Sequence, residues 1–183
     1  AGATEIYRVG GAQAIAAMTY GTPTIRHVQK VFGPGNAYVV AAKRLLFGHV
    51  AIDLLPGPSE ILILADKTGN PDFIAADILA QAEHGGDSMV GFATDSKALL
   101  GKVIKAIERQ LPTLSRTKII KEVLKRGTFL LHVKSFAEGV AICNAFAPEH
   151  LSLITANEKR WLPLIRTCGA IYLGNDSPVA VGE

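Results

Sequence analysis

The dipeptide Glu149-His150 contains two side chains that can move protons. Pro148 cannot continue the helix predicted before it, and an apolar run, Leu151–Ile154, follows the pair. We therefore place the pair at a sheet edge of the kind where α/β enzymes carry their sites. A carboxylate beside an imidazole supplies two groups that exchange protons near neutral pH. A solvent-facing loop pair would look the same, so the dipeptide alone does not distinguish the two interpretations.

Gln81 and His84 are three residues apart near the end of a predicted helix, so they share one helix face. An imidazole is a strong zinc ligand and an amide oxygen is a weak one. Zinc sites need three or four ligands, and this pair supplies two. The alternative is a histidine that the helix dipole favours near the C-terminus of a helix. The spacing alone favours this alternative over a metal site.

Two strand-to-helix junctions near the N-terminus each place an amide side chain at a helix start. Gln13 follows Gly10-Gly11, and Asn36 follows Gly33-Pro34-Gly35. A glycine turn lets backbone amides approach a ligand, and the helix dipole favours an anion there. Such residues are also ordinary in turns, and neither junction has the spacing of a G-x-G-x-x-G motif or a P-loop. Ser59, just before a predicted strand, is a further polar candidate.

The elements that must position these residues follow one pattern. Apolar, β-branched runs alternate with helical patterns along the chain, which is typical of an α/β fold with a mainly parallel sheet. Asn70 and Pro71 fit an N-cap followed by proline at N1. Pro56-Gly57-Pro58 opposes both helix and central strand, so we expect a crossing between two lobes there. The predicted strands are Ile6–Val9, Val28–Phe32, Ile61–Ala65, Met89–Ala93, Phe129–Val133, Leu151–Ile154 and Ile171–Leu173, and the predicted helices are Gly11–Tyr20, Asn36–Phe47, Pro71–His84, Ser96–Gln110, Arg116–Arg126, Phe136–Phe146 and Glu158–Cys168.

The composition limits the class of protein. The chain has 183 residues, of which 49% are hydrophobic, and a net charge of +3, which suits one ordinary domain or two small lobes. No basic block interleaves with aromatic residues, so we expect no nucleic-acid partner. No apolar run reaches the roughly 18 residues of a membrane helix. Cys143 and Cys168 show no C-x-x-C or disulfide spacing, which favours a reducing compartment: the cytoplasm, or a plastid if the source is a plant.

Five segments, taken together, resemble the signature segments of the histidinol dehydrogenase family. They occur in that family's order and at similar separations, and the resemblance covers nearly the whole chain. The segments are V-G-G-A-Q-A-I-A-A (Val9–Ala17), K-V-F-G-P-G-N-A-Y-V (Lys30–Val39), A-I-D-L-L-P-G-P-S-E (Ala51–Glu60), A-Q-A-E-H-G (Ala80–Gly85) and A-P-E-H-L (Ala147–Leu151).

The resemblance implies an enzyme that oxidises L-histidinol to L-histidine. In that family the alcohol passes through an aldehyde-level intermediate, and two NAD molecules accept hydride in succession. The family's Glu-His pair matches Glu149 and His150. The resemblance therefore implies that Glu149 activates the water that attacks the aldehyde level, that His150 is the general base, and that both contact the substrate.

The resemblance also implies a zinc ion that anchors the imidazole and amino groups of the substrate. Gln81 and His84 match zinc ligands that also bind substrate, and Ser59 matches a serine that contacts substrate. Glu183 aligns with the third ligand, which also binds substrate and is an aspartate in the family. The extra methylene of Glu183 moves the carboxylate by about 1.5 Å. The positions that match NAD contacts are Gln13 and Asn36.

The family architecture implies two incomplete Rossmann-like lobes on a scaffold resembling that of aldehyde dehydrogenases, assembled as a homodimer. Residues 1–55 would then belong to the NAD-side lobe and residues 56–183 to the lobe with the zinc and catalytic residues. The chain opens without methionine and stops at Glu183, so we interpret it as a fragment. On the family pattern it lacks an N-terminal portion that frames the NAD site and a downstream histidine, the fourth zinc ligand, which the partner subunit contributes. We expect the fragment alone to be inactive.

Other functions remain open at this point. A related NAD-dependent dehydrogenase could act on another small alcohol, such as a sulfonated diol, and residues outside this chain would discriminate. A catalytically inactive zinc- or nucleotide-binding module, or a structural fragment, is a second alternative. Aldehyde dehydrogenase proper would need a reactive cysteine in a glycine-rich turn, and neither Cys143 nor Cys168 lies in one.

Overall fold

The computed structural model describes residues 2–55, 57, 59–85 and 88–181. The chain divides into two compact units, residues 1–57 (unit 1) and residues 58–183 (unit 2). Pro56 and Pro58, where we expected a crossing between lobes, lie outside the described residues, as does Glu183. None of the helices in the described part of the chain is long and apolar enough to cross a membrane.

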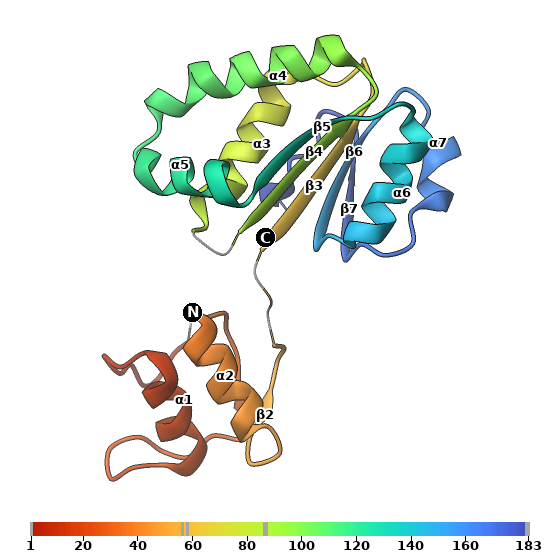
Figure 1. Ribbon diagram of the computed structural model, residues 1–183. Coiled ribbons are helices and arrows are strands. Elements are labelled where there is room, and N and C mark those ends of the chain that lie inside the picture. Colours follow the sequence, from red (N-terminus) through yellow and green to blue (C-terminus); the bar gives the residue numbers. More distant parts are fainter. Residues whose placement is uncertain (1, 56, 58, 86–87, 182–183) are drawn as a thin grey trace. The chain divides into compact units, whose positions relative to one another are not determined.

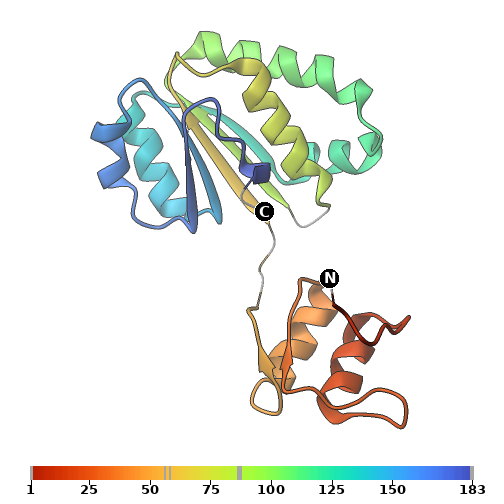
Figure 2. The same cartoon turned by 180° about the vertical axis from the view of Figure 1, so that it is seen from behind.

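Unit 2 contains a five-stranded parallel sheet in the order β5-β4-β3-β6-β7. The central strand, β3, is a nearly continuous apolar run that is buried on both faces, as is usual in parallel sheets. The helices α3, α4 and α5 cover one face, and α6 and α7 cover the other (Figures 1 and 2). The strands are β3 (Glu60–Ala65), β4 (Met89–Thr94), β5 (Thr128–His132), β6 (His150–Ile154) and β7 (Ala170–Leu173), and the helices are α3 (Pro71–Glu83), α4 (Lys97–Gln110), α5 (Thr117–Arg126), α6 (Phe136–Phe146) and α7 (Glu158–Trp161), with 3-10 turns η1 (Leu111–Thr113), η2 (Leu162–Leu164) and η3 (Val179–Val181).

The two faces of the unit 2 sheet carry separate cores, because successive residues of a strand point to opposite faces. Ile61 and Ile63 of β3 pack with α3, α4 and α5, whereas Leu62 and Leu64 pack with α6. The predicted α/β fold with a mainly parallel sheet is therefore confirmed. At the carboxyl ends of the strands, the Asp66 carboxylate accepts hydrogen bonds from Thr68 and Thr155 side chains and joins β3 to β6.

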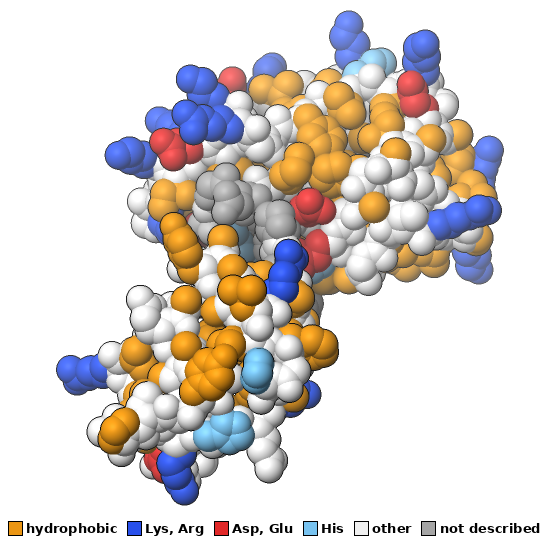
Figure 3. Space-filling view, turned by 60° about the horizontal axis from the view of Figure 1, so that its bottom comes forward, with side chains coloured by type: hydrophobic (Ala, Val, Ile, Leu, Met, Phe, Trp, Pro, Cys, Tyr) orange, Lys and Arg blue, Asp and Glu red, His pale blue; other side chains and the backbone are white. Residues whose placement is uncertain are grey.

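Unit 1 contains two helices and a short pair of parallel strands. Its elements are α1 (Gly11–Tyr20), β1 (Lys30–Val31), α2 (Ala37–Leu46) and β2 (Ala51–Ile52). Its buried apolar residues are few: Ile15, Val31, Ala42 and Val50 form the core cluster. Large apolar side chains are exposed on the same unit, and Figure 3 shows apolar side chains on its surface; they include Ile6, Tyr20, Phe32, Tyr38, Leu45 and Phe47.

One element prediction was wrong, and two predicted elements were too long. Ile6–Val9 is not a strand, because no described residue pairs with it, and Ile6 is 86% exposed. In the predicted strand Val28–Phe32, Lys30–Val31 alone form ladder pairs, and their partner β2 was missed. The helix predicted over Glu158–Cys168 ends at Trp161 and tightens into η2, where Pro163 has no N–H to donate.

Candidate functional site

The Glu149-His150 pair lies at the amino ends of the unit 2 strands. His150 opens β6 and pairs with Ile61 of β3, and the backbone N–H of Glu60 donates to Glu149 Oε2 at 3.3 Å. The expectation that the pair lies at the usual edge of an α/β site, where strands end, was therefore wrong. The reason is the direction of the chain: α6 runs back along the sheet to the amino ends of the strands (Figure 1). Pro148 follows the end of α6, and the chain enters β6 directly afterwards.

The end of α3 reaches the same edge. Asn70 caps the start of α3, with its side chain accepting from the N–H groups of Asp72 and Phe73, and Pro71 is at N1 as predicted. The helix leaves the carboxyl end of β3 and returns along the sheet, so its last turn lies where the strands begin. The sequence therefore places Gln81 and His84 at the amino edge of the sheet, with His84 as the C-cap.

The side chains of these elements share one face of the sheet. Ile61 packs in the core under α3 and lines a pocket of about 420 Å³ together with Gln81 and His84. His150 is in register with Ile61, so its side chain points to the same face. Its ring lies 5.8 Å from that of Tyr172, edge to face. The helix end and the Glu149-His150 segment are therefore on one side of the sheet at one edge, as a common site requires.

Three buried polar side-chain atoms on this face have no hydrogen-bond partner among the described residues. These are Nε2 of Gln81, a side chain that is 3% exposed, Nδ1 of His150, and Oγ of Ser152, two residues further along β6. Buried polar atoms in folded proteins are nearly always paired, so an unpaired one calls for an explanation. A ligand in the pocket that pairs with Gln81 and His150 would remove the free-energy cost of leaving these two atoms unpaired. Since an amide can turn to present either atom, Gln81 can offer its oxygen to a cation.

Three charged residues that line the pocket, Asp77, Glu83 and Arg116, were not identified from the sequence. Asp77 lies one turn before Gln81 and lines the same pocket, and burial raises the pKa of its carboxyl to about 6. The i, i+4 spacing from Gln81 could have identified it, because residues so spaced share a helix face. Arg116, which precedes α5, also lines the pocket. Nothing in the local sequence indicates that, because a distant element brings Arg116 there.

The metal-ligand prediction concerns Gln81, His84 and Glu183. Among the described residues, no three His, Cys, Asp or Glu side chains are grouped so as to hold a metal ion. Gln81 is not one of these four residue types, and Glu183 lies outside the described residues. The donors described here are therefore a buried amide and an imidazole at the end of the same helix, a set that fits half of a four-ligand zinc site. Ser59 lies at the same edge, and its carbonyl accepts from the Met89 N–H.

The predicted NAD contacts both lie at helix starts in unit 1. Gln13 is exposed in the first turn of α1. Asn36 is the N-cap of α2, and its Oδ1 accepts from the N–H groups of Tyr38 at 3.1 Å and Val39 at 3.2 Å. These two bonds leave the amide nitrogen of Asn36 as the donor available to a ligand.

Comparisons with known proteins agree with one another. A family model described as histidinol dehydrogenase matches residues 1–183. The chain is 51% identical to histidinol dehydrogenase from Rhodopseudomonas palustris and 49% identical to that from Methanothermobacter thermautotrophicus, in each case over all of this chain. It spans 42% and 43% of the length of these two relatives.

The solved structures that are similar to this chain include the following two. The crystal structure of histidinol dehydrogenase from Elizabethkingia anophelis has a TM-score of 0.90 at 43% identity, covering 99% of this chain and 42% of that one. Gamma-glutamyl phosphate reductase from Thermotoga maritima has a TM-score of 0.54 at 13% identity, covering 91% of this chain and 45% of that one, which indicates a shared fold alone. On the family model and these identities, the chain belongs to the histidinol dehydrogenase family.

Proposed function

We propose that the protein containing this chain oxidises L-histidinol to L-histidine with NAD as the hydride acceptor. The observation that carries the proposal is that two buried polar atoms without a partner among the described residues, Gln81 Nε2 and His150 Nδ1, lie on one face and at one edge of the unit 2 sheet. The reaction is inferred from membership of the family. The groups that would carry it out are the side chains at the amino edge of the unit 2 sheet.

His150 and Glu149 divide the proton transfers. In the first oxidation a hydride leaves the carbinol carbon for NAD, and His150 takes the hydroxyl proton, which forms the aldehyde level. Water then adds to the aldehyde carbon, and Glu149 takes the proton that the water loses. The second hydride would pass to a second NAD, and His150, after it has released its first proton to solvent, would take the remaining hydroxyl proton, which gives the carboxylate. The Glu60 N–H holds one oxygen of Glu149, so the other oxygen remains available to the water.

Gln81 and His84 are the described residues that would hold zinc, with Glu183 as the third ligand from this chain and a histidine of a partner subunit as the fourth. When bound, the zinc anchors the imidazole and amino groups of the substrate. Gln81 fits this role because its buried amide has an unsatisfied end, which a ligand in the pocket would satisfy. Ser59, at the same edge, would contact the substrate.

Gln13 and Asn36 would contact NAD from unit 1. We assign residues 1–55 to the NAD-side lobe and residues 56–183 to the lobe with the zinc and catalytic residues, on a scaffold like that of aldehyde dehydrogenases. We also propose a homodimer, because the fourth ligand comes from a second copy. The two free thiols suit a reducing compartment, so we place the activity in the cytoplasm.

The test is an assay of the complete gene product with zinc, NAD and histidinol. We expect two NADH molecules for each histidinol consumed and histidine as the product, and a sulfonated diol should give no NADH. Substitution His84→Ala should remove bound zinc, measured by metal analysis, without unfolding the protein. Oxidation of another alcohol in preference to histidinol would overturn the proposal. A polypeptide of these 183 residues alone is expected to form no NADH.

A further inference from the structure

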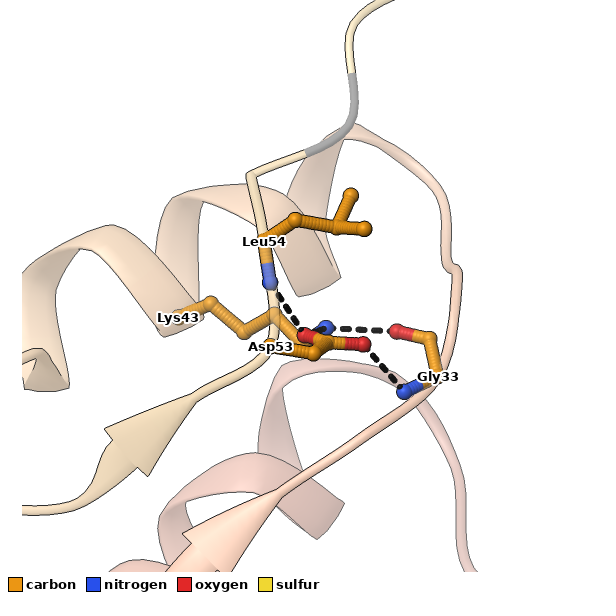
Figure 4. A network of polar contacts seen from close by, with 4 residues as sticks. All are labelled: Gly33, Lys43, Asp53 and Leu54. Atoms are coloured by element: carbon orange, nitrogen blue, oxygen red, sulfur yellow. Dashed lines mark hydrogen bonds and ion pairs between the residues drawn. The ribbon is translucent and has the colours of Figure 1, made fainter.

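Lys43 is the buried charged side chain that the proposed reaction does not use. It is 1% exposed, and it is the one lysine, arginine, aspartate or glutamate among the described residues that is buried. Its Nζ donates to Asp53 Oδ1 at 2.6 Å and to the carbonyl of Gly33 at 2.5 Å (Figure 4). Lys43 belongs to α2 and Asp53 follows β2, so the pair joins two elements of unit 1.

Asp53 completes a closed network around the same glycine. Its Oδ2 accepts from the Gly33 N–H at 2.7 Å, and its Oδ1 accepts from the Leu54 N–H at 2.7 Å. The hydrogen bond from Lys43, followed by those from Gly33 and Leu54, holds the pKa of the Asp53 carboxyl well below its usual range. Both backbone groups of Gly33 are therefore bonded to side chains of the pair (Figure 4).

Gly33 opens the turn that leads to Asn36. Gly33 has φ +119°, a conformation that side chains rarely adopt, and Pro34 has a fixed φ. Two residues after Gly33, a Cβ at Gly35 would meet the side chain of Val39, so that position is also tightly packed. With Gly33 clamped at one end and Asn36 capping α2 at the other, the turn has little freedom to move.

Stability alone does not account for a charge in this position. Removing an ammonium group from water costs free energy, and a well-packed apolar side chain at such a site is often neutral or stabilising by comparison. What the ion pair adds is geometry, because charged hydrogen bonds fix both the N–H and the C=O of one residue, Gly33. We infer that Lys43 and Asp53 are positioning residues for the dinucleotide: they hold the Gly33 turn so that Asn36 presents its amide nitrogen to NAD. This rests on the proposed function.

The test uses the complete gene product and the double variant Lys43→Met with Asp53→Asn. Removing both charges avoids leaving one buried and unpaired. We expect the Kd for NAD, measured by calorimetry, and the KM for NAD to rise at least about tenfold. The KM for histidinol and kcat at saturating NAD should stay within about threefold. The matched control is Arg44→Met, the exposed neighbour on α2, which should change none of these values.

Each result has one interpretation. Unchanged NAD affinity in the folded double variant overturns the inference. A joint loss of thermal stability, kcat and affinity for both substrates also overturns it, because that pattern indicates a structural role alone. Should the double variant not fold, Asp53→Asn decides in the same way, since asparagine keeps the size and one acceptor. Absence of NAD-dependent oxidation in the unmodified protein would instead refute the proposed function.

Discussion

Gly169 lies against the backbone of Glu149. A Cβ added at Gly169 would stand 2.8 Å from the Glu149 carbonyl oxygen, closer than real Cβ contacts come. The Gly169 N–H donates to the Pro148 carbonyl at 3.1 Å, and the next N–H, that of Ala170, donates to the Glu149 carbonyl at 2.9 Å. The segment that enters β7 therefore fixes the segment that carries the proposed water-activating carboxylate.

Gly169→Ala should therefore displace Glu149. Because the added methyl meets backbone rather than a flexible side chain, we expect the free energy of unfolding to fall by about 1–3 kcal/mol. We expect kcat to fall about tenfold or more, since small misplacements of a catalytic group are costly. Steady-state NADH formation and thermal melts would check this, and a variant with unchanged kcat would contradict the close contact.

Gly101→Ala is the matched control. Gly101 lies in α4, and a Cβ there would meet nothing within 4 Å. Alanine is favoured over glycine in a helix by about 1 kcal/mol, so the variant should melt at a higher temperature. Its kcat should equal that of the unmodified protein. A lower melting temperature for this variant would show that Gly101 is required for a reason other than the space around its Cβ position.

Glu149→Gln should separate the two oxidations. Glutamine keeps an oxygen for the Glu60 N–H but cannot take a proton from water, so the step from aldehyde to acid should slow by about 10²–10⁴-fold. The alcohol step should change much less. Assays started from histidinol and from histidinaldehyde would measure the two steps. Glu122→Gln, an exposed change on α5, should leave both rates as they were; equal loss of both rates in the Glu149 variant would refute the division of roles.

Asp77 makes stability depend on pH. Burial raises its pKa from 3.8 to about 6, so the folded protein favours the neutral carboxyl, and this group's contribution to stability falls as pH rises from about 4 to about 6. The full shift corresponds to at most about 3 kcal/mol. Because Asp77 is partly exposed, we expect less than this full value: Asp77→Asn should raise the free energy of unfolding by about 1–2 kcal/mol near pH 8. The gain should become smaller as the pH falls below 6.

Denaturant titrations at several pH values would measure this dependence. Asp95→Asn, an exposed change, should show no such gain at any pH. A destabilised Asp77→Asn variant near pH 8 would mean that the carboxylate has a cationic partner in the complete protein. Arg116, in the same pocket, would then be the first residue to replace.

Cys143 should be unreactive in the folded protein. It is fully buried, and burial raises the pKa of its thiol to about 12; burial raises the pKa of Cys168 as well. Because the thiolate is the reactive form, native protein should react with iodoacetamide at pH 8 far more slowly than protein unfolded in guanidinium. Rapid alkylation of Cys143 in the native state would contradict this and would reopen a thiol-based mechanism.

Local signals in the sequence predicted much of unit 2. The apolar run Ile61–Ala65 is β3 after one added residue, and Asn70-Pro71 starts α3 as expected. Local signals did not predict the strands of unit 1 correctly, because whether a segment is a strand there depends on the segment beside it. Ile6–Val9 has strand-forming residues but no described strand beside it, whereas Ala51–Ile52 is a strand because Lys30–Val31 lies alongside. A strand depends on its neighbour, which no short window of sequence contains.

The sequence proposed the residues of the candidate site, but it did not predict at which edge of the sheet they lie. Glu149, His150, Gln81 and His84 were identified from motifs and resemblance, yet the edge of the sheet on which they lie depends on chain direction. The strand order puts β6 beside β3, and no local pattern encodes that order. Arg116 was missed for the same reason, because the pocket exists only after the sheet and its helices pack, whereas the i, i+4 spacing from Gln81 could have identified Asp77.

The pairing of β3 with β6 also bears on when the site can form during folding. Glu60 and Glu149 are 89 residues apart in the chain, and their contact crosses that pairing. Joining segments so distant is entropically slow, whereas helices such as α3 can form within microseconds. A refolding chain should therefore recover its helical signal well before it recovers catalysis, and a nascent chain cannot be competent until β6 has been synthesised.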